Sequence, residues 1–152
     1  MEVGYKNWRR IQELNARRIK RSLFIDTSSV REVDPELFTK LNEKKGIHEF
    51  LEEFLLSAEY TNSKEIDVTN LMLFRKYIAW FLRRQEKIRG DLQISARLLQ
   101  PVESGIPMEI YAFTSETTFM LYEDVQAQIM EHIIASARYF GVVIYQKQSG
   151  GA

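Results

Sequence analysis

Few side chains in this sequence are suited to catalysis or to metal binding. The two histidines, His48 and His132, lie far apart, and neither has a companion at a spacing typical of metal ligands. His132 follows Glu131 within a stretch of helical periodicity, where a solvated side chain is expected. The acidic pairs Glu52-Glu53 and Glu123-Asp124 lie between apolar positions of predicted helices, which also indicates solvated faces. The sequence therefore assembles no nucleophile, base and orienting group, and it predicts no catalytic residue.

The glycine and cysteine content excludes two further classes of site. The seven glycines are scattered, and none belongs to a phosphate-binding loop. The chain contains no cysteine, which excludes disulfides, thiolate catalysis and zinc–sulfur sites. We therefore predict a non-enzymatic protein with no metal ligand, no cofactor-binding residue and no cofactor.

One aromatic pair has the spacing of a nucleic-acid platform. Tyr111 and Phe113, on the third strand of a predicted βαββαβ unit, resemble the stacking aromatics of an RNA-recognition motif. That motif needs a basic residue and a glycine before the first aromatic, whereas this chain has Glu109-Ile110 there. The carboxylate of Glu109 would repel phosphate. We therefore favour aromatics that cover a sheet face or a subunit contact, and we predict no nucleic-acid partner.

A basic cluster, Arg17-Arg18-Ile19-Lys20-Arg21, has two interpretations. It is either the solvated start of a strand, or an electrostatic feature that steers anions or meets an acidic partner. The first 21 residues carry seven basic and two acidic side chains, although the formal net charge of the whole chain is zero. The sequence leaves the two interpretations open.

The whole chain has the length and composition of one soluble domain, or of one domain with a fragment of another. It has 152 residues, of which 45% are hydrophobic and 28% are charged. A net charge of zero argues against a dedicated nucleic-acid-binding protein. The longest apolar run, Tyr77 to Leu82, is far shorter than the roughly 20 residues that cross a bilayer. The polar, basic N-terminus is unlike a signal peptide.

The second half of the chain predicts a strand, a turn, a strand, a helix and a strand. Apolar and polar residues alternate on both sides of a turn that contains Ser104-Gly105, which is typical of a β-hairpin. Apolar residues then recur every three or four positions, which predicts a helix that Gly141 ends. These elements cover, in order, 92–98, 101–107, 108–113, 122–140 and 142–145.

The first half predicts one strand and three helices. Asp34-Pro35-Glu36 combines an N-cap acid, a proline at the first helical position and an acid in the first turn. Gly46 is expected to end this helix, and Thr69 or Asn70 is expected to cap the third one. The strand covers 22–30, and the helices cover 34–45, 47–58 and 69–84. The predicted fold is α+β, a ferredoxin-like βαββαβ sandwich with extra helices inserted between 34 and 58.

Five stretches of the sequence resemble the small-conductance mechanosensitive channel family of bacteria, and more narrowly its larger, miniconductance branch. They occur in the order expected for that branch and cover nearly the full chain. They are Tyr5-Lys6-Asn7-Trp8-Arg9, Arg17-Arg18-Ile19-Lys20-Arg21-Ser22-Leu23, Phe24-Ile25-Asp26-Thr27-Ser28-Ser29-Val30, Pro107-Met108-Glu109-Ile110-Tyr111-Ala112-Phe113-Thr114 and Tyr122-Glu123-Asp124-Val125-Gln126-Ala127-Gln128-Ile129.

This resemblance implies a place within a larger membrane protein. Residues 1–19 would form the end of a β-domain and its connection, 20–148 an α/β cytoplasmic domain that includes the extra helices of the branch, and 149–152 a tail. Identical subunits would join as a heptamer into a vestibule that filters ions, in the cytoplasmic portion of an inner-membrane protein. The membrane would be reached only through N-terminal helices that this chain lacks, and the pore would lie in them.

The sequence departs from the miniconductance branch at one loop, and one alternative function stays open. The loop after Trp8 tends to be glycine-rich in the branch, whereas here it is Arg10-Ile11-Gln12-Glu13-Leu14-Asn15-Ala16, which leaves open a helix in that segment. The alternative function is a free-standing ferredoxin-like binding module for RNA or a small ligand. Hydrophobic segments of about 20 residues encoded upstream of Met1 would distinguish the channel from the module.

Overall fold

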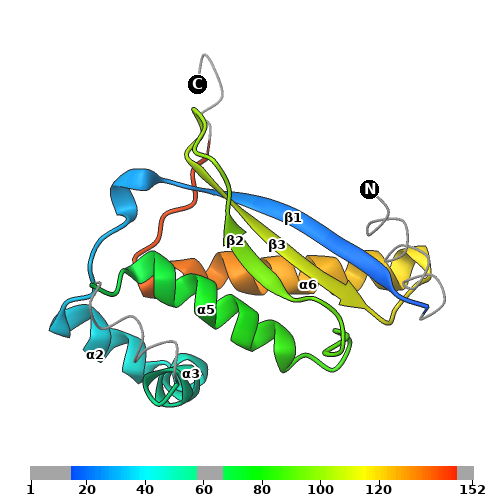
Figure 1. Ribbon diagram of the computed structural model, residues 1–152, viewed down its shortest axis with the longest axis horizontal. Helices are drawn as coiled ribbons and strands as arrows, with labels where there is room; N and C mark the ends of the chain where they lie inside the picture. Colours follow the sequence, from blue (N-terminus) through cyan, green and yellow to red (C-terminus); the bar gives the residue numbers. More distant parts are fainter. Residues whose placement is uncertain (1–14, 58–66, 147–152) are drawn as a thin grey trace.

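The computed structural model describes residues 15–57 and 67–146, and its centre is a three-stranded antiparallel sheet in the order β1-β3-β2 (Figure 1). The strands are β1 (Arg17–Ile25), β2 (Ser95–Leu98) and β3 (Ile106–Thr114). Arg17 pairs with Thr114, Ile25 pairs with Ile106, and Ser95 pairs with Tyr111. The predictions for 1–14 and for the 149–152 tail lie outside the described residues.

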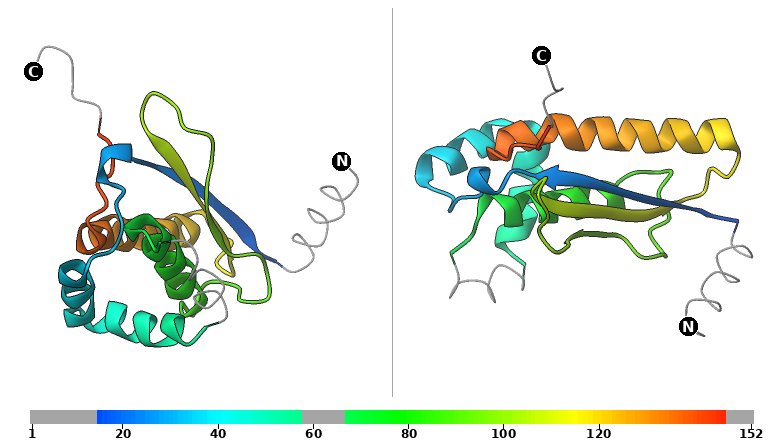
Figure 2. Two further views of the ribbon diagram at one scale, coloured as in Figure 1. Left: turned by 60° about the vertical axis from the view of Figure 1, so that its left-hand side comes forward. Right: turned by 90° about the horizontal axis from the view of Figure 1, so that it is seen from above.

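One face of the sheet carries the hydrophobic core, as the alternating pattern predicted. Helices α5 (Asn70–Arg83) and α6 (Phe119–Ala137) both cover this face, and the fold is α+β (Figures 1 and 2). Helices α2 (Pro35–Glu43) and α3 (Lys45–Leu55) pack farther from the sheet, beside α5. The strand residues buried on this face are Ile19, Leu23, Ile25, Met108, Ile110 and Ala112. Within 15–57 and 67–146, no helix combines the length and the apolar character needed to span a bilayer.

Local side chains begin and end the helices largely as predicted. The backbone N–H of Leu37 donates to Asp34 Oδ1 (2.8 Å), so Asp34 caps α2. The backbone N–H of Met72 donates to Thr69 Oγ1 (3.1 Å), so Thr69 caps α5. Gly141 adopts φ = 70° after the short 3₁₀ turn η2 (Arg138–Phe140) that follows α6. The role predicted for Gly46 is wrong, because α2 ends where Lys44 becomes extended and Gly46 already lies in α3.

The first strand starts and ends earlier than predicted. It begins at Arg17, so it crosses the boundary between 19 and 20 that the sequence suggested for the domain. It ends at Ile25 because Asp26 turns the chain: Asp26 Oδ1 accepts from the backbone N–H of Ser28 (2.9 Å) and from its hydroxyl (2.7 Å). The 3₁₀ turn η1 (Thr27–Ser29) therefore replaces the predicted extension to residue 30.

Two other predicted strands are shorter in the structure. The strand predicted from residue 92 begins only at Ser95, because residues 87–89 occupy the neighbouring end of β3, where the N–H of Arg89 donates to the carbonyl of Phe113 (2.8 Å). The strand predicted over 142–145 is reduced to one antiparallel bridge between Ile144 and Ile25. The backbone N–H of Val143 donates to Ser29 Oγ (3.0 Å), so a side chain replaces a backbone strand partner at Val143.

Asn70 is a fully buried polar residue that ties three separate segments together. Its Nδ2 donates to the carbonyls of Ser29 (3.0 Å) and Phe140 (3.0 Å), and its Oδ1 accepts from the backbone N–H of Arg31 (2.9 Å). Its own N–H donates to the Arg31 carbonyl (2.9 Å). The side chain thus joins the loop after β1, the start of α5 and the end of η2.

We expect Asn70→Ala to lower the free energy of unfolding by about 2–4 kcal/mol, because it leaves buried backbone groups without partners. Asn42→Ala is the matched control, since the Asn42 amide is only half-buried and donates to Phe38 of its own helix (3.2 Å). The control should cost less than about 1 kcal/mol. Urea denaturation measures both, and equal losses would contradict the role given to Asn70.

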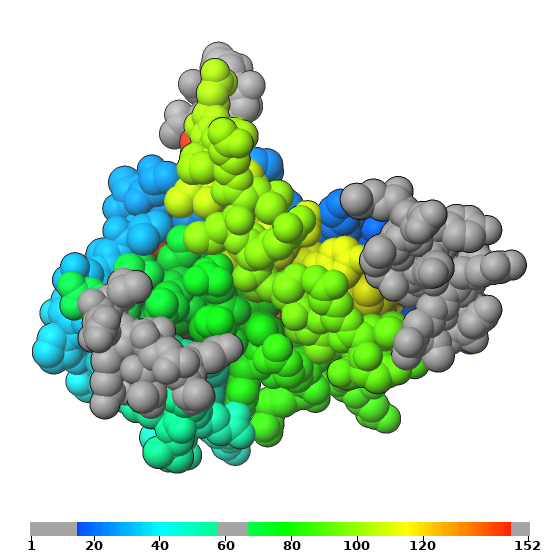
Figure 3. Space-filling view, viewed as in Figure 1, coloured from blue at the N-terminus to red at the C-terminus, as the bar shows by residue number. Residues whose placement is uncertain are grey.

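A second pair of variants tests the β2–β3 hairpin, which projects from the body of the molecule (Figure 3). Gly105 has φ = +111°, and a Cβ there would lie 2.2 Å from the carbonyl oxygen of Ile25. We expect Gly105→Ala to cost at least about 2 kcal/mol of stability. Gly46, in α3, has open space around it, so Gly46→Ala should add about 0.5–1 kcal/mol. In thermal unfolding, the Tm of Gly105→Ala should lie below that of the unmodified chain, and the Tm of Gly46→Ala should lie above it.

Candidate functional site

The structure places the two histidines in different environments and brings neither to a metal-binding group. In the part of the chain that the structure describes, no group of three or more histidine and acidic side chains could hold a metal ion. His48 is exposed on α3, where its Nε2 lies 2.9 Å from Glu52 Oε1 and its Nδ1 lies 3.1 Å from Asn42 Oδ1. The first is a surface contact within α3, and the second joins α3 to α2.

His132 is packed between helices, so the solvated position expected for it is wrong. Its ring stacks on Phe81 of α5, with centroids 3.9 Å apart and planes 12° from parallel. Its Nε2 lies 2.8 Å from the Tyr77 hydroxyl. Burial lowers the pKa of His132 below its ordinary value, and the nearby positive charge of Lys44 lowers it further. Burial also raises the pKa of Tyr77, so both partners favour their neutral forms near pH 7.

The hydroxyl of Ser136 lies 3.3 Å from His132 Nε2, a pairing that is otherwise found in nucleophilic catalysis. Here the hydroxyl proton is directed elsewhere, because Ser136 Oγ donates to the main-chain carbonyl of His132 (2.7 Å). Ser136 is only 5% exposed, and a substrate could not reach it. The arrangement fits a helix-packing contact better than a nucleophile.

The aromatic pair lies on the face of the sheet turned away from α5 and α6, which we call the far face. Tyr111 and Phe113 meet edge to face with centroids 5.4 Å apart. Phe113 is only 3% exposed, so its ring cannot receive a stacked base. Glu109 is not an unpaired acid, because Arg97 Nε lies 3.0 Å from its carboxylate. Because Arg97 pairs with it, the carboxylate of Glu109 repels phosphate less than the sequence suggests, while the burial of Phe113 independently disfavours a nucleic-acid platform.

The basic cluster is divided between the two faces of β1. Arg17 stacks on the ring of Tyr122 at the start of α6 (4.0 Å) and donates to the carbonyl of Thr117 (3.3 Å). Arg18 points to the far face, where its guanidinium lies 6.0 Å from the ring centroid of Tyr111. Lys20 and Arg21 are exposed. Two of the four charges are thus held against aromatic rings, and two are presented to solvent.

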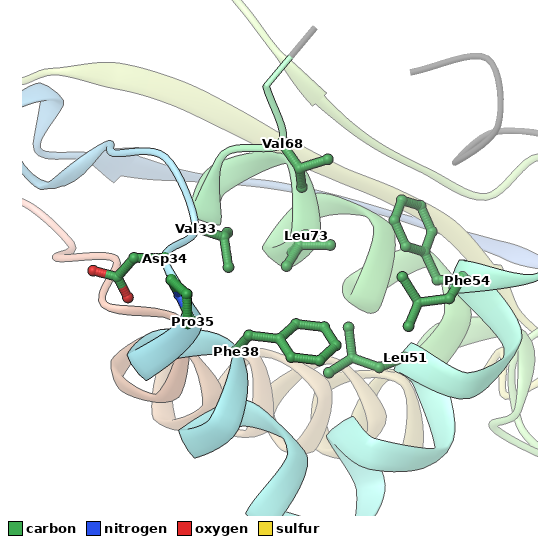
Figure 4. Close-up of a pocket in the computed structure, with 9 residues that line it drawn as sticks. Val33, Asp34, Pro35, Phe38, Leu51, Phe54, Val68 and Leu73 are labelled. Atoms are coloured by element: carbon green, nitrogen blue, oxygen red, sulfur yellow. The ribbon is translucent and has the colours of Figure 1, made fainter. Parts of the chain in front are cut away.

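An apolar pocket of about 370 Å³ opens between α2, α3 and the start of α5 (Figure 4). Asp34 is the one charged side chain among the described residues that line it, and its carboxylate already accepts from Leu37 and Arg31. The Leu37 N–H, followed by Arg31, holds the pKa of Asp34 below its usual range. The remaining lining residues are Val33, Pro35, Phe38, Leu51, Phe54, Leu55, Val68 and Leu73.

This pocket could hold an apolar group, but no polar side chain is left in its described lining to orient a reaction. Sequence reasoning missed it because its walls form only when α2 and α3 pack against the start of α5. The sequence shows only that Val33 and Phe38 are apolar, and that both stay half-buried is visible in the structure alone. A comparison of the sequence with protein-family models found no match.

The lowered pKa of His132 predicts how stability depends on pH. Protonation is harder in the folded than in the unfolded chain, so the stabilising contribution is complete above the unfolded pKa of about 6.5 and is lost as pH falls through the folded value. The pKa values of Asp26 and Asp34 are lowered from 3.8, so their contributions are lost only in stronger acid.

We therefore expect the free energy of unfolding to fall between pH 7.5 and pH 5, and His132→Phe, which keeps a ring against Phe81, to flatten that fall. His48→Gln removes an exposed imidazole and serves as the control. This variant should keep the same fall in the free energy of unfolding as the unmodified chain. Urea denaturation at several pH values measures the slopes. An unchanged slope in His132→Phe would show that another group titrates.

Proposed function

We propose that this chain is the α/β part of a mechanosensitive channel of the small-conductance family, within its miniconductance branch. The observation that carries the proposal is the way in which the resembling stretches meet. The stretch 24–30 covers the last two residues of β1 and the turn η1, 107–114 covers nearly all of β3, and 122–129 lies in α6. β1 pairs with β3 along its whole length, and the Tyr122 hydroxyl donates to the carbonyl of Arg18 (2.6 Å). Residues distant in sequence thus form one contiguous unit, as expected if they were inherited together.

The order of the strands supports the proposal that the fold is a ferredoxin-like sandwich. With the bridge from Ile144 to Ile25, the spatial order is residue 144, β1, β3, β2, with all neighbours antiparallel. This is the order of a ferredoxin-like βαββαβ sandwich, with α5 and α6 as its two helices. In this proposal, the inserted helices α2 and α3 are the extra helices that the branch carries. The final strand of the sandwich is represented here by a single bridge.

In this proposal the domain is non-enzymatic and acts in assembly of the vestibule and in ion filtering. The start of α6 supplies a surface for assembly, because Phe119, Met120 and Leu121 are 63%, 74% and 49% exposed. Consecutive exposed large apolar side chains are typical of a protein contact. Exposed charges, such as those of Lys20 and Arg21, would act on ions nearby. Identical subunits are the proposed partners, in the cytoplasmic portion of an inner-membrane heptamer whose pore lies in N-terminal helices outside this chain.

A second candidate is a binding module for a small ligand, which the apolar pocket between α2, α3 and α5 favours. A volume of about 370 Å³ lies within the range of ligand pockets. The pocket lacks convergent polar groups, which such sites normally use to orient a ligand. An RNA-binding module has less support, because Phe113 is buried.

The channel proposal is tested by the gene and by its complete product. We expect the reading frame upstream of Met1 to encode apolar segments of about 20 residues. The complete protein in a patched membrane should give currents on applied suction. A stop codon directly upstream, with a separately translated chain, would favour the binding module.

The assembly role predicts a difference between two surface variants of the complete protein. Met120→Glu should reduce the heptamer that chemical crosslinking and light scattering detect, because it places a charge in a proposed apolar contact. Leu56→Glu is the control, since Leu56 is 89% exposed at the end of α3. Equal assembly of both variants would contradict a subunit contact at the start of α6.

Without tethering through the membrane helices, the chain alone should be monomeric or weakly associated at micromolar concentration.

A further inference from the structure

Among the residues that the structure describes, the backbone groups on the outer edge of β1, the side away from β3, have partners at only two points. Near the C-terminal end, the N–H of Tyr145 donates to the carbonyl of Phe24 (2.7 Å). Near the N-terminal end, the Tyr122 hydroxyl donates to the carbonyl of Arg18 (2.6 Å). No described residue pairs with the edge between these two points. We call the segment from Arg18 to Ser22 the open edge.

The direction of its backbone groups follows from these two bonds. Carbonyl and N–H groups of a strand point alternately to one neighbour and to the other. Because Phe24 and Arg18 point outward, Lys20 and Ser22 also turn both their N–H and their C=O outward, whereas Arg21 turns toward β3. The side chains of Lys20, Arg21 and Ser22 are all exposed. The open edge therefore presents two donors and two acceptors in the spacing of a β-ladder.

The charges beside the open edge are mostly positive. Arg18 and Lys20 lie on the far face, and Arg21 lies on the other face. Glu109 on β3 is already paired with Arg97, on the β2 side. On α6, Glu123 lies near the edge, and its carboxylate accepts from Gln126 Nε2 (3.4 Å). The local field thus favours acidic groups.

We propose that the open edge of β1 accepts an extended peptide strand in which acidic residues alternate with apolar ones. The acidic side chains would lie on the far face, beside Arg18 and Lys20. The apolar side chains would face α6, where the row that begins at Tyr122 continues at one-turn spacing with Gln126, Met130 and Ile134. Ile134 is 48% exposed and Met130 is partly buried, so both gain cover from an added strand.

Other occupants fit the open edge less well. A phosphate backbone accepts hydrogen bonds, so it could satisfy the N–H groups of Lys20 and Ser22 but would leave their carbonyls without donors. A second copy of β1 would place Arg18, Lys20 and Arg21 opposite like charges, which destabilises strand pairing. An acidic peptide satisfies both the backbone groups and the side-chain charges.

The probe for the test is a fluorescein-labelled peptide of alternating glutamate and valine, added to the full chain and followed by fluorescence anisotropy. We expect saturable binding that weakens with added salt. Arg18→Glu combined with Lys20→Glu should weaken it by about tenfold or more, because two attractive cross-strand pairs become repulsive. Lys40→Glu combined with Lys45→Glu makes the same change of charge on α2 and α3, and should leave the affinity within about twofold.

Two measurements on the unmodified chain keep the test independent of folding effects in the variants. Peptides N-methylated along the edge that faces β1 should fail to bind, while peptides methylated along the opposite edge should bind. Amide exchange by NMR should slow at Lys20 and Ser22 on peptide addition, and stay unchanged at Arg21. The proposal is overturned by indifference to N-methylation, by protection only elsewhere in the chain, by equal binding of an oligonucleotide of the same charge, or by no binding at millimolar peptide.

Discussion

The buried amide of Asn70 is the constraint on which the arrangement of the chain depends. Its side chain holds the loop after β1, the start of α5 and the end of η2 with three hydrogen bonds, in a place that water does not reach. A buried amide is stable only when its donors and acceptor are all used, so the three segments must arrive in one geometry. This links the sheet to both covering helices at the end where they meet α2. The apolar layers supply most of the stabilisation, and Asn70 fixes how they are aligned.

Much of the fold follows from local rules that the sequence displays. The two-residue alternation in β3, the Asp34 cap, the Thr69 cap and the left-handed Gly141 all depend on residues close to one another in the chain. The predictions that proved wrong failed because of contacts between segments that are distant in sequence. Ser29 displaces a strand partner from Val143, residues 87–89 shorten β2, and Phe81 buries His132. Asp26 is a local turn signal, because its carboxylate binds Ser28 two residues on, whereas the pocket between α2, α3 and α5 exists only in the packed structure.

Positive charge on this surface is often anchored on aromatic rings. Arg17 lies 4.0 Å from the ring centroid of Tyr122, Arg84 lies 4.6 Å from Trp80, and Lys44 lies 5.2 Å from Tyr139. Such contacts contribute modestly to stability at exposed sites, but they restrict the rotamers of long side chains. The position of charge is then set by the core that holds the rings. A vestibule wall or a peptide-binding edge would both benefit from charges with defined positions.

The pairing of β1 with β3 also determines the order in which the molecule can be built. Arg17 pairs with Thr114, so the sheet joins the beginning of the described chain to a segment made much later. Such non-local contacts slow folding, because a long loop must close before they form. During synthesis, β1 leaves the ribosome well before β3, so the edge that β3 covers is still unpaired. Four cations within five residues then keep nascent strands apart through mutual repulsion. The basic cluster would therefore protect the growing chain from aggregation before it takes any role in the finished protein.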